Sequence, residues 1–199
     1  MEQDRGKRFL LVVFLLLAII VMAVLSRPRS HAGGFTPLAN RPAMPDLKMA
    51  ELNGGSWRLA DHQGQVVLIN YWATWCGPCR MELPGLAKVA REDEPLGLAV
   101  VGVDLDRGDQ SVIEPFVDRY HIPYPIAVPA TMSQIEAGLE GVPTTILVDR
   151  TGHVAKTYVG AVREEDLQAD VRQALTEPVA QPDDQSADPV DSGASVLKP

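Results

Sequence analysis

The sequence predicts an α/β domain built on a mixed sheet with helices on both faces. Two continuous apolar runs, Val66–Trp72 and Leu96–Val103, have the composition of strands that are covered on both sides. Segments with helical spacing alternate with these runs, and a strand–turn–strand pattern follows them. The chain has 199 residues, of which 46% are hydrophobic and 22% charged. This leaves room for one domain with a sizeable core and a further segment at each end.

The first half of the predicted domain opens with a β-hairpin. Its strands, Leu47–Leu52 and Ser56–Leu59, flank the turn residues Asn53-Gly54-Gly55. The buried strand Val66–Trp72 comes next. A helix is predicted from Cys76 to about Asp93, because apolar residues recur there at helical spacing. Its candidate core positions are Met81, Leu83, Leu86, Val89 and Ala90.

The second half alternates in the same way and ends with a hairpin and an amphipathic helix. In chain order it is predicted to contain a strand, a helix, a short strand, one or two helical turns, a hairpin and a closing helix. These elements lie at Leu96–Val103, Gln110–Tyr120, Tyr124–Val128, Ser133–Leu139, Thr144–Asp149 with Val154–Val159, and Glu164–Leu175. Such an order is typical of a mixed sheet with packed helices.

An apolar run from Phe9 to Leu25 precedes the domain and contains no charged residue, proline or glycine. At about 1.5 Å per residue it is just long enough to cross a hydrocarbon core of roughly 30 Å. We predict a single transmembrane anchor at residues 9–25, with residues 1–8 in the cytoplasm and the domain on the periplasmic or extracytoplasmic side. A cleaved signal peptide is the alternative, although its apolar region is usually shorter.

Two segments with few large apolar residues flank the predicted domain at 42–176. Residues 26–41 contain prolines and glycines and are predicted to form a flexible tether. Residues 177–199 are rich in Pro, Asp, Ser, Gln and Ala. They cannot bury enough apolar surface to offset their ordering entropy, so we predict a disordered tail.

Composition argues against several classes of function. A net charge of −8 without a Lys/Arg cluster argues against nucleic-acid binding. Two cysteines exclude a disulfide-rich scaffold and a Cys₄ zinc site, and Asp104 with Asp106 offers too few oxygen ligands for a calcium loop. We therefore predict no metal and no cofactor. The histidines are scattered and are expected on the surface or in loops: His31, His62, His121 and His153.

The two cysteines, Cys76 and Cys79, stand two residues apart between a buried strand and a helix. This spacing predicts a redox-active disulfide that closes and opens; a purely stabilising disulfide is the alternative, but so short a loop removes little unfolded-chain entropy. The helix N-terminus should stabilise the Cys76 thiolate, which makes Cys76 the attacking thiol. Cys79 lies one turn further on and should be the resolving thiol. Gly77 lets the backbone turn closely, and Pro78 suits a first helical turn.

These residues resemble a known family. The sequence Trp75-Cys76-Gly77-Pro78-Cys79 after an apolar strand, with Pro84 five residues on and Gly141-Val142-Pro143-Thr144 before the hairpin, resembles the thioredoxin fold. The longer segment Asn70–Pro84 is similar to the TlpA/ResA-like membrane-anchored thiol–disulfide oxidoreductases. The resemblance spans about Pro45 to Leu175 and implies a thioredoxin fold with an N-terminal β-hairpin extension.

The resemblance also implies roles for individual residues. Val142-Pro143 matches the loop whose proline is cis in the family and whose backbone pairs with the substrate chain. Glu82 matches an acidic position that can raise the thiol pKa of Cys79 and relay its proton, while a solvated helix glutamate is the alternative. Asn70 replaces a buried aspartate of cytoplasmic thioredoxins. The residues expected to contact substrate are Trp75, Gly77, Pro78, Val142 and Pro143. For Trp75 the alternative is packing in the core, and for Pro143 it is an ordinary loop proline.

By this resemblance the chain is expected to be an extracytoplasmic reductase of protein disulfides. Family substrates include the Cys-x-x-Cys-His sites of apocytochromes c and the metal-site cysteines of oxidase assembly factors, and a membrane electron donor of the DsbD/CcdA type would re-reduce the dithiol. A disulfide oxidase or isomerase uses the same domain in reverse. A Cu(I)-binding assembly protein is the alternative from another class, with His153 as third ligand. The chain lacks the Pro-x-x-x-Thr-x-x-Cys arrangement of peroxiredoxins.

Overall fold

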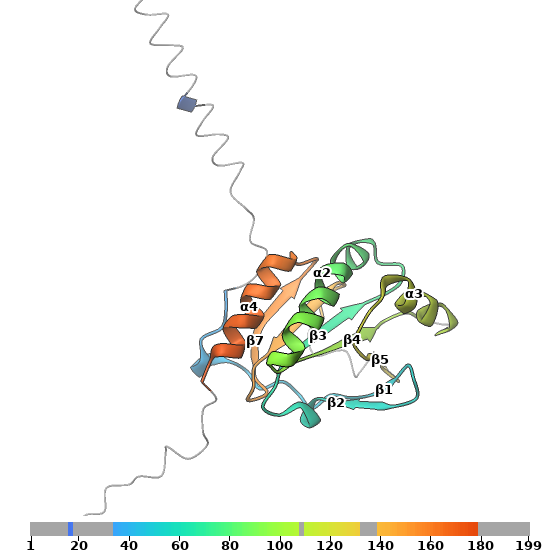
Figure 1. The fold of residues 1–199 in the computed structure, drawn as a ribbon, viewed down its shortest axis with the longest axis horizontal. Coiled ribbons are helices and arrows are strands. Elements are labelled where there is room, and N and C mark those ends of the chain that lie inside the picture. The colour runs from blue at the N-terminus through green and yellow to red at the C-terminus, as the bar shows by residue number, and fades with distance from the viewer. Residues whose placement is uncertain (1–15, 18–33, 108–109, 132–138, 179–199) are drawn as a thin grey trace, which may run out of the picture. The chain divides into compact units, whose positions relative to one another are not determined.

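The computed structural model describes residues 16–17, 34–107, 110–131 and 139–178. Its strands form one mixed sheet in the order β2-β1-β5-β4-β3-β6-β7 (Figure 1). The strands are β1 Lys48–Glu51, β2 Ser56–Arg58, β3 Val66–Trp72, β4 Leu98–Asp104, β5 Ile126–Val128, β6 Thr144–Val148 and β7 Val154–Val159. The α-helices are α2 Gly77–Asp93, α3 Ile113–Tyr120 and α4 Glu164–Thr176, and the 3₁₀ helices are η1 Leu38–Asn40, η2 Leu59–His62, η3 Glu94–Leu96 and η4 Gln110–Val112.

Strand β3 lies in the interior of the sheet, between β4 and β6, and the cysteines follow its carboxyl end. It pairs in parallel with β4 and antiparallel with β6, and β4 pairs in parallel with β5. The hairpin β1–β2 joins the sheet through an antiparallel pairing of β1 with β5. Every residue of β3 is buried, which explains why its sequence is a continuous apolar run with one polar residue, Asn70.

The three α-helices of the described residues pack on one face of the sheet, and the 3₁₀ helix η2 begins on the other. Residues of α2, α3 and α4 share one apolar cluster with the side chains of Leu68 and Trp72, and α2 and α4 lie side by side (Figure 1). The physical reason lies in the strand order. The sheet grows in one direction from β3 through β4 to β5, so right-handed crossovers place α2 and α3 on the same side.

The other face has its own apolar cluster, formed by the alternate residues of β3 with the hairpin β1–β2, the start of η2 and the segment before β1. The predicted helical turns at 133–139 lie outside the described residues, except for Leu139, which packs against this second cluster. Both faces of the central strands are thus covered, and the dithiol loop can leave β3 from a rigid support.

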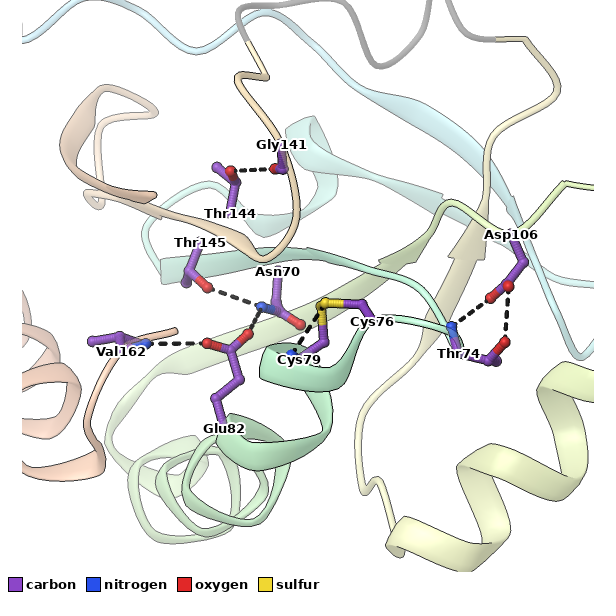
Figure 2. Close-up of a disulfide and its surroundings, with 10 residues drawn as sticks. All are labelled: Asn70, Thr74, Cys76, Cys79, Glu82, Asp106, Gly141, Thr144, Thr145 and Val162. Carbon is purple, nitrogen blue, oxygen red and sulfur yellow. Dashed lines mark hydrogen bonds between the residues drawn. A yellow bond between two sulfur atoms is a disulfide. The ribbon is translucent and has the colours of Figure 1, made fainter. Parts of the chain in front are cut away.

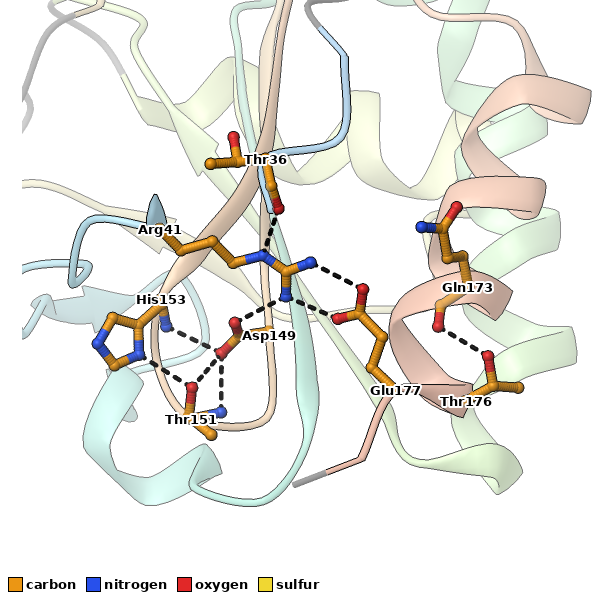
Figure 3. A network of polar contacts seen from close by, with 8 residues as sticks. All are labelled: Thr36, Arg41, Asp149, Thr151, His153, Gln173, Thr176 and Glu177. Carbon is orange, nitrogen blue, oxygen red and sulfur yellow. Dashed lines mark hydrogen bonds and ion pairs between the residues drawn. The ribbon is translucent and has the colours of Figure 1, made fainter. Parts of the chain in front are cut away.

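The described domain begins before residue 42, the boundary that the sequence predicts. Phe35 packs against the helix-side cluster, and the Thr36 amide donates a hydrogen bond of 2.8 Å to the Ala155 carbonyl. The buried Arg41 pairs with Asp149 at the end of β6 and with Glu177 after α4 (Figure 3). Residues 35–41 therefore belong to the folded domain, because they close a polar network with its last residues.

The predicted membrane anchor at 9–25 lies outside the described residues apart from Leu16 and Leu17, and so do residues 26–33 and 179–199. Among the residues that the structure describes, no helix combines the length and the apolar character that a membrane span requires.

Candidate active site

The two cysteines form a closed disulfide where β3 gives way to α2 (Figure 2). Cys76 is the N-cap of α2, and its Sγ accepts a hydrogen bond of 3.2 Å from the Cys79 amide. Cys76 is 4% exposed and Cys79 is fully buried. Cys76 is therefore the more exposed of the two cysteines, and it lies at the end of a helix whose free N–H groups favour an anion.

Gly77 and Pro78 form the first turn of α2, as the motif predicts. The proline occupies a position where its missing N–H removes no helical hydrogen bond, and its fixed backbone angle suits the turn. No side-chain atom would obstruct a methyl group at Gly77, so the glycine leaves open space beside the disulfide. This space is available to the backbone of a bound chain.

Thr74 is held in place by hydrogen bonds to the segment that follows β4, a contact that the sequence does not reveal. Its amide and its hydroxyl donate to Asp106, at 2.7 and 2.8 Å (Figure 2). Asp104 is the last residue of β4, two positions before Asp106. Burial of the Asp104 carboxyl group, together with its interactions with Asp106, raises the pKa of Asp104 to about 8. Asp106, which with Asp104 offers too few ligands for a calcium loop, thus anchors the residue two positions before Cys76.

Glu82 is buried on α2, one turn beyond Cys79, and not on a solvated helix face. Its two oxygens accept hydrogen bonds from Asn70 Nδ2, at 2.9 Å, and from the Val162 amide, at 3.2 Å. Burial raises its pKa to about 7, although both hydrogen bonds act in the opposite direction. A carboxyl group with such a pKa both holds and releases a proton near neutral pH, as proton transfer at a thiol requires.

Asn70 connects β3 to Glu82 and to the next strand. Its Nδ2 also donates to Thr145 Oγ1 on β6, at 2.9 Å, so both of its N–H groups are used. Its Oδ1 is buried, has no hydrogen-bond partner and points toward the disulfide (Figure 2). The sequence shows that a neutral amide replaces an acid here, but not that one face of this amide is left unpaired.

The loop before β6 lies next to the dithiol. Thr144 pairs with Tyr71 across β6 and β3, which places Val142 and Pro143 beside the exit of β3. The Val142-Pro143 peptide bond is cis, as the resemblance implies. Thr144 Oγ1 donates to the Gly141 carbonyl at 2.7 Å and fixes the turn (Figure 2). Val142 is half-buried and Pro143 buried.

Two large apolar side chains near the cysteines are exposed: Trp75 at 66% and Met81 at 74%. We call this pair the apolar rim. Trp72, in contrast, is fully buried and stacks on Phe116 at a centroid distance of 5.0 Å. The prediction of Met81 as a core residue is wrong, because the face of α2 that meets the sheet runs through Cys79, Leu83 and Leu86.

The third ligand of the Cu(I) alternative does not lie at the site. His153 stands in the β6–β7 turn, at the opposite end of β6 from Pro143, with its Nδ1 at 2.9 Å from Thr151 Oγ1. In the described part of the chain, no group of three or more His, Cys, Asp or Glu side chains is arranged to hold a metal ion.

Comparisons with known proteins agree with this geometry. The model of the AhpC/TSA family matches residues 41–180. The thiol-disulfide oxidoreductase ResA of Geobacillus thermodenitrificans is 31% identical over 133 residues, which cover 66% of this chain and 76% of the relative. The thioredoxin-like protein YneN of Bacillus subtilis is 32% identical over 126 residues, covering 62% of this chain and 74% of the relative.

Among solved structures, a secreted thiol-disulfide isomerase from Corynebacterium glutamicum is similar with a TM-score of 0.68 and 26% identity. The match covers 76% of this chain and 96% of that chain. These similarities confirm the predicted thioredoxin fold.

Proposed function

This chain belongs to the AhpC/TSA family and is a protein thiol–disulfide oxidoreductase of the ResA-like kind, and from this premise we propose that it reduces protein disulfides outside the cytoplasm. The observation that carries the proposal is the asymmetry of the dithiol. Cys76 caps a helix and is 4% exposed, while Cys79 is fully buried beside the pair Asn70–Glu82. This asymmetry supports Cys76 as the attacking sulfur and Cys79 as the resolving one.

The reaction follows from this asymmetry. The Cys76 thiolate attacks one sulfur of a substrate disulfide, and the other substrate sulfur leaves with the electrons of the broken bond. Cys79 then gives up its proton and attacks the Cys76 sulfur, which frees the second substrate thiol and closes the disulfide seen in the structure. Two electrons have passed to the substrate, and a membrane dithiol donor of the DsbD/CcdA type returns them.

Glu82 serves as the acceptor of the Cys79 proton. It is an acidic group on the same helix, one turn away, and its pKa of about 7 lets it take up and release a proton near neutral pH. The apolar rim, Trp75 and Met81, and the backbone at Val142 and Pro143 then receive the substrate chain on either side of Cys76.

The proposed location and partners are those that such a reductase requires. The apolar run at 9–25 anchors the chain in the cytoplasmic membrane and keeps the domain on the side where protein disulfides form. Suitable substrates are the oxidised Cys-x-x-Cys-His sites of apocytochromes c or the metal-site cysteines of oxidase assembly factors. Gly-Pro between the cysteines resembles the reducing members of the group.

Trapping of the mixed disulfide tests the roles of the cysteines. Cys79→Ala should accumulate a covalent complex with a disulfide substrate, because nothing resolves it, whereas Cys76→Ala should not. Both are read out by non-reducing gel electrophoresis. Equal trapping by the two variants would refute the assignment.

The direction of the reaction is tested separately by the reduction potential of the Cys76–Cys79 couple. A value near that of thioredoxin, about −270 mV, supports a reductase. A value near about −120 mV means that the domain is an oxidant, and a value near about −180 mV means that it is an isomerase.

A further inference from the structure

The amide oxygen of Asn70 lacks a partner in the disulfide form of the site. Asn70 is fully buried, both of its N–H groups are bound to Glu82 and Thr145, and no described group donates to its Oδ1. Trp72 Nε1 and the Tyr124 hydroxyl, two buried donors of the apolar cluster under the helices, are likewise without a hydrogen-bond partner, so neither donates to this oxygen. Buried amide oxygens are almost always paired.

The position of this oxygen indicates which donor it serves. Its amide nitrogen is fixed to Glu82, one helical turn beyond Cys79, and the oxygen points toward the disulfide (Figure 2). A disulfide sulfur carries no proton and donates nothing. A reduced Cys79 carries an S–H group, which is a weak hydrogen-bond donor. The missing donor of the oxidised state is therefore created by reduction itself.

We propose that Asn70 Oδ1 accepts a hydrogen bond from the Cys79 thiol in the reduced protein and so stabilises the dithiol against the disulfide. In the balanced step, a donor dithiol passes two electrons and two protons to the Cys76–Cys79 bond and becomes a disulfide. One of these protons resides on Cys79 and points at the amide. Because an amide does not titrate near neutral pH, the strength of this acceptor does not change with pH in the physiological range.

The inference rests on the dithiol chemistry of the proposed function but not on its direction. Its direct consequence is a shift in redox equilibrium. Asn70→Leu, a change of little volume, should lower the equilibrium constant for reduction by a reference dithiol about three- to tenfold, the range expected for one net hydrogen bond. This corresponds to a reduction potential more negative by about 14 to 30 mV.

A double-mutant cycle separates this contact from an effect through Glu82, which Asn70 also holds. The Leu substitution is measured in the natural chain and in Glu82→Gln. If Asn70 acts directly on Cys79, the fold-change persists in the Gln background. If it acts only by holding the Glu82 carboxylate, the fold-change disappears there, and the proposal is overturned.

The pKa of Cys79 supplies a readout that a merely structural role would not move. A hydrogen bond donated by the neutral thiol favours the neutral form, so Asn70→Leu should lower the pKa of Cys79. This is followed by thiolate absorbance in a Cys76→Ser background. Thr145→Val is the matched control, because it removes the other partner of the amide nitrogen and leaves the oxygen in place; a shift below twofold is expected.

Thermal unfolding checks that the variants are folded. If Asn70→Leu is unfolded, the smaller Asn70→Ala takes its place, with the same expected direction. An unchanged equilibrium constant in the folded variant, while the natural chain still exchanges disulfides, refutes the role of Asn70. Failure of the natural chain to exchange disulfides refutes the proposed function instead.

Discussion

At the scale of single residues, Glu82 links the redox site to pH. Its folded pKa of about 7 lies above its ordinary value of 4.5, because the carboxyl group is buried. The folded protein therefore holds this proton more tightly than the unfolded chain does. The contribution of Glu82 to stability is largest below about pH 4.5 and declines as the pH rises to about 7, by an amount on the order of 3 kcal/mol.

Glu82→Gln should remove this part of the pH dependence. We expect the free energy of unfolding of the variant to fall less between pH 5 and pH 8 than that of the natural chain, as measured by urea titration at each pH. Asp104, whose pKa is raised to about 8, titrates in an overlapping range and stays in both proteins, so the difference between them isolates Glu82. Equal slopes would mean that Glu82 is ionised throughout.

The same substitution should slow turnover, because an amide does not accept the proton of Cys79. The rate of disulfide reduction is expected to fall about 10²-fold or more at the optimum, the lower range of general acid–base contributions. A variant that keeps its fold, loses the pH slope and keeps the full rate would return Glu82 to a structural role.

At the scale of elements, Arg41 joins three parts of the domain that are distant in the sequence. Its guanidinium contacts Asp149 at 2.9 Å and Glu177 at 2.6 Å, and its Nε donates to the Thr36 carbonyl at 2.8 Å (Figure 3). The side chain of Arg41 is 1% exposed and that of Asp149 is 6% exposed. Removing the cation leaves a buried carboxylate without its charge partner.

We therefore expect Arg41→Met to lower the free energy of unfolding by about 3 kcal/mol, toward the low end of values for broken buried pairs because Thr151 also donates to Asp149. The matched control is Arg58→Met at the exposed pair with Asp46, where both side chains are nearly half exposed. There a loss below about 1 kcal/mol is expected. Chemical denaturation measures both, and similar losses would argue against the network.

The elements themselves are largely readable from the sequence, because each depends on a local period. The predicted strand 66–72 matches β3, and the predicted helix from Cys76 includes α2. The start of β4 is less readable: the structure begins it at Leu98, since η3 occupies residues 94–96 and Gly97, with a φ of +99°, turns the chain. A continuous apolar run hides this turn.

The polar contacts of the site cannot be predicted from the sequence in the same way. The spacing gives Cys76 and Cys79 at once, but the burial of Glu82 depends on Asn70, 12 residues away, and on Val162, 80 residues away. The tie between Thr74 and Asp106 spans 32 residues. Contacts of this kind are set by how strands and helices meet, which one-dimensional periodicity does not record.

At the scale of the whole molecule, the folded domain determines where the chain can be cut. A chain that begins at residue 34 keeps Phe35, the Thr36–Ala155 hydrogen bond and Arg41. It should be soluble and redox-active, with the stability of the natural domain. A chain that begins at residue 42 loses all three contacts, so it should be less stable by at least the cost of Arg41→Met. Denaturant titration of the two fragments decides between the boundaries.

The same boundary limits how far an anchored domain reaches. If residues 9–25 are held in the membrane, the nine residues 26–34 separate them from Phe35, which packs in the described domain, and nine residues span at most roughly 30 Å. Such a short link keeps the dithiol at high effective concentration near membrane-bound partners and out of reach of distant ones.

The natural chain should therefore reduce its substrates in the cell faster than the fragment from residue 34, exported with a cleavable signal at equal abundance. The two forms should be equally active on a soluble disulfide in vitro, because the domain is the same. The measurement is the oxidised fraction of the substrate cysteines in cells that carry one form or the other. Full activity of the exported fragment in the cell would show that anchoring is dispensable and would favour a cleaved signal at 9–25.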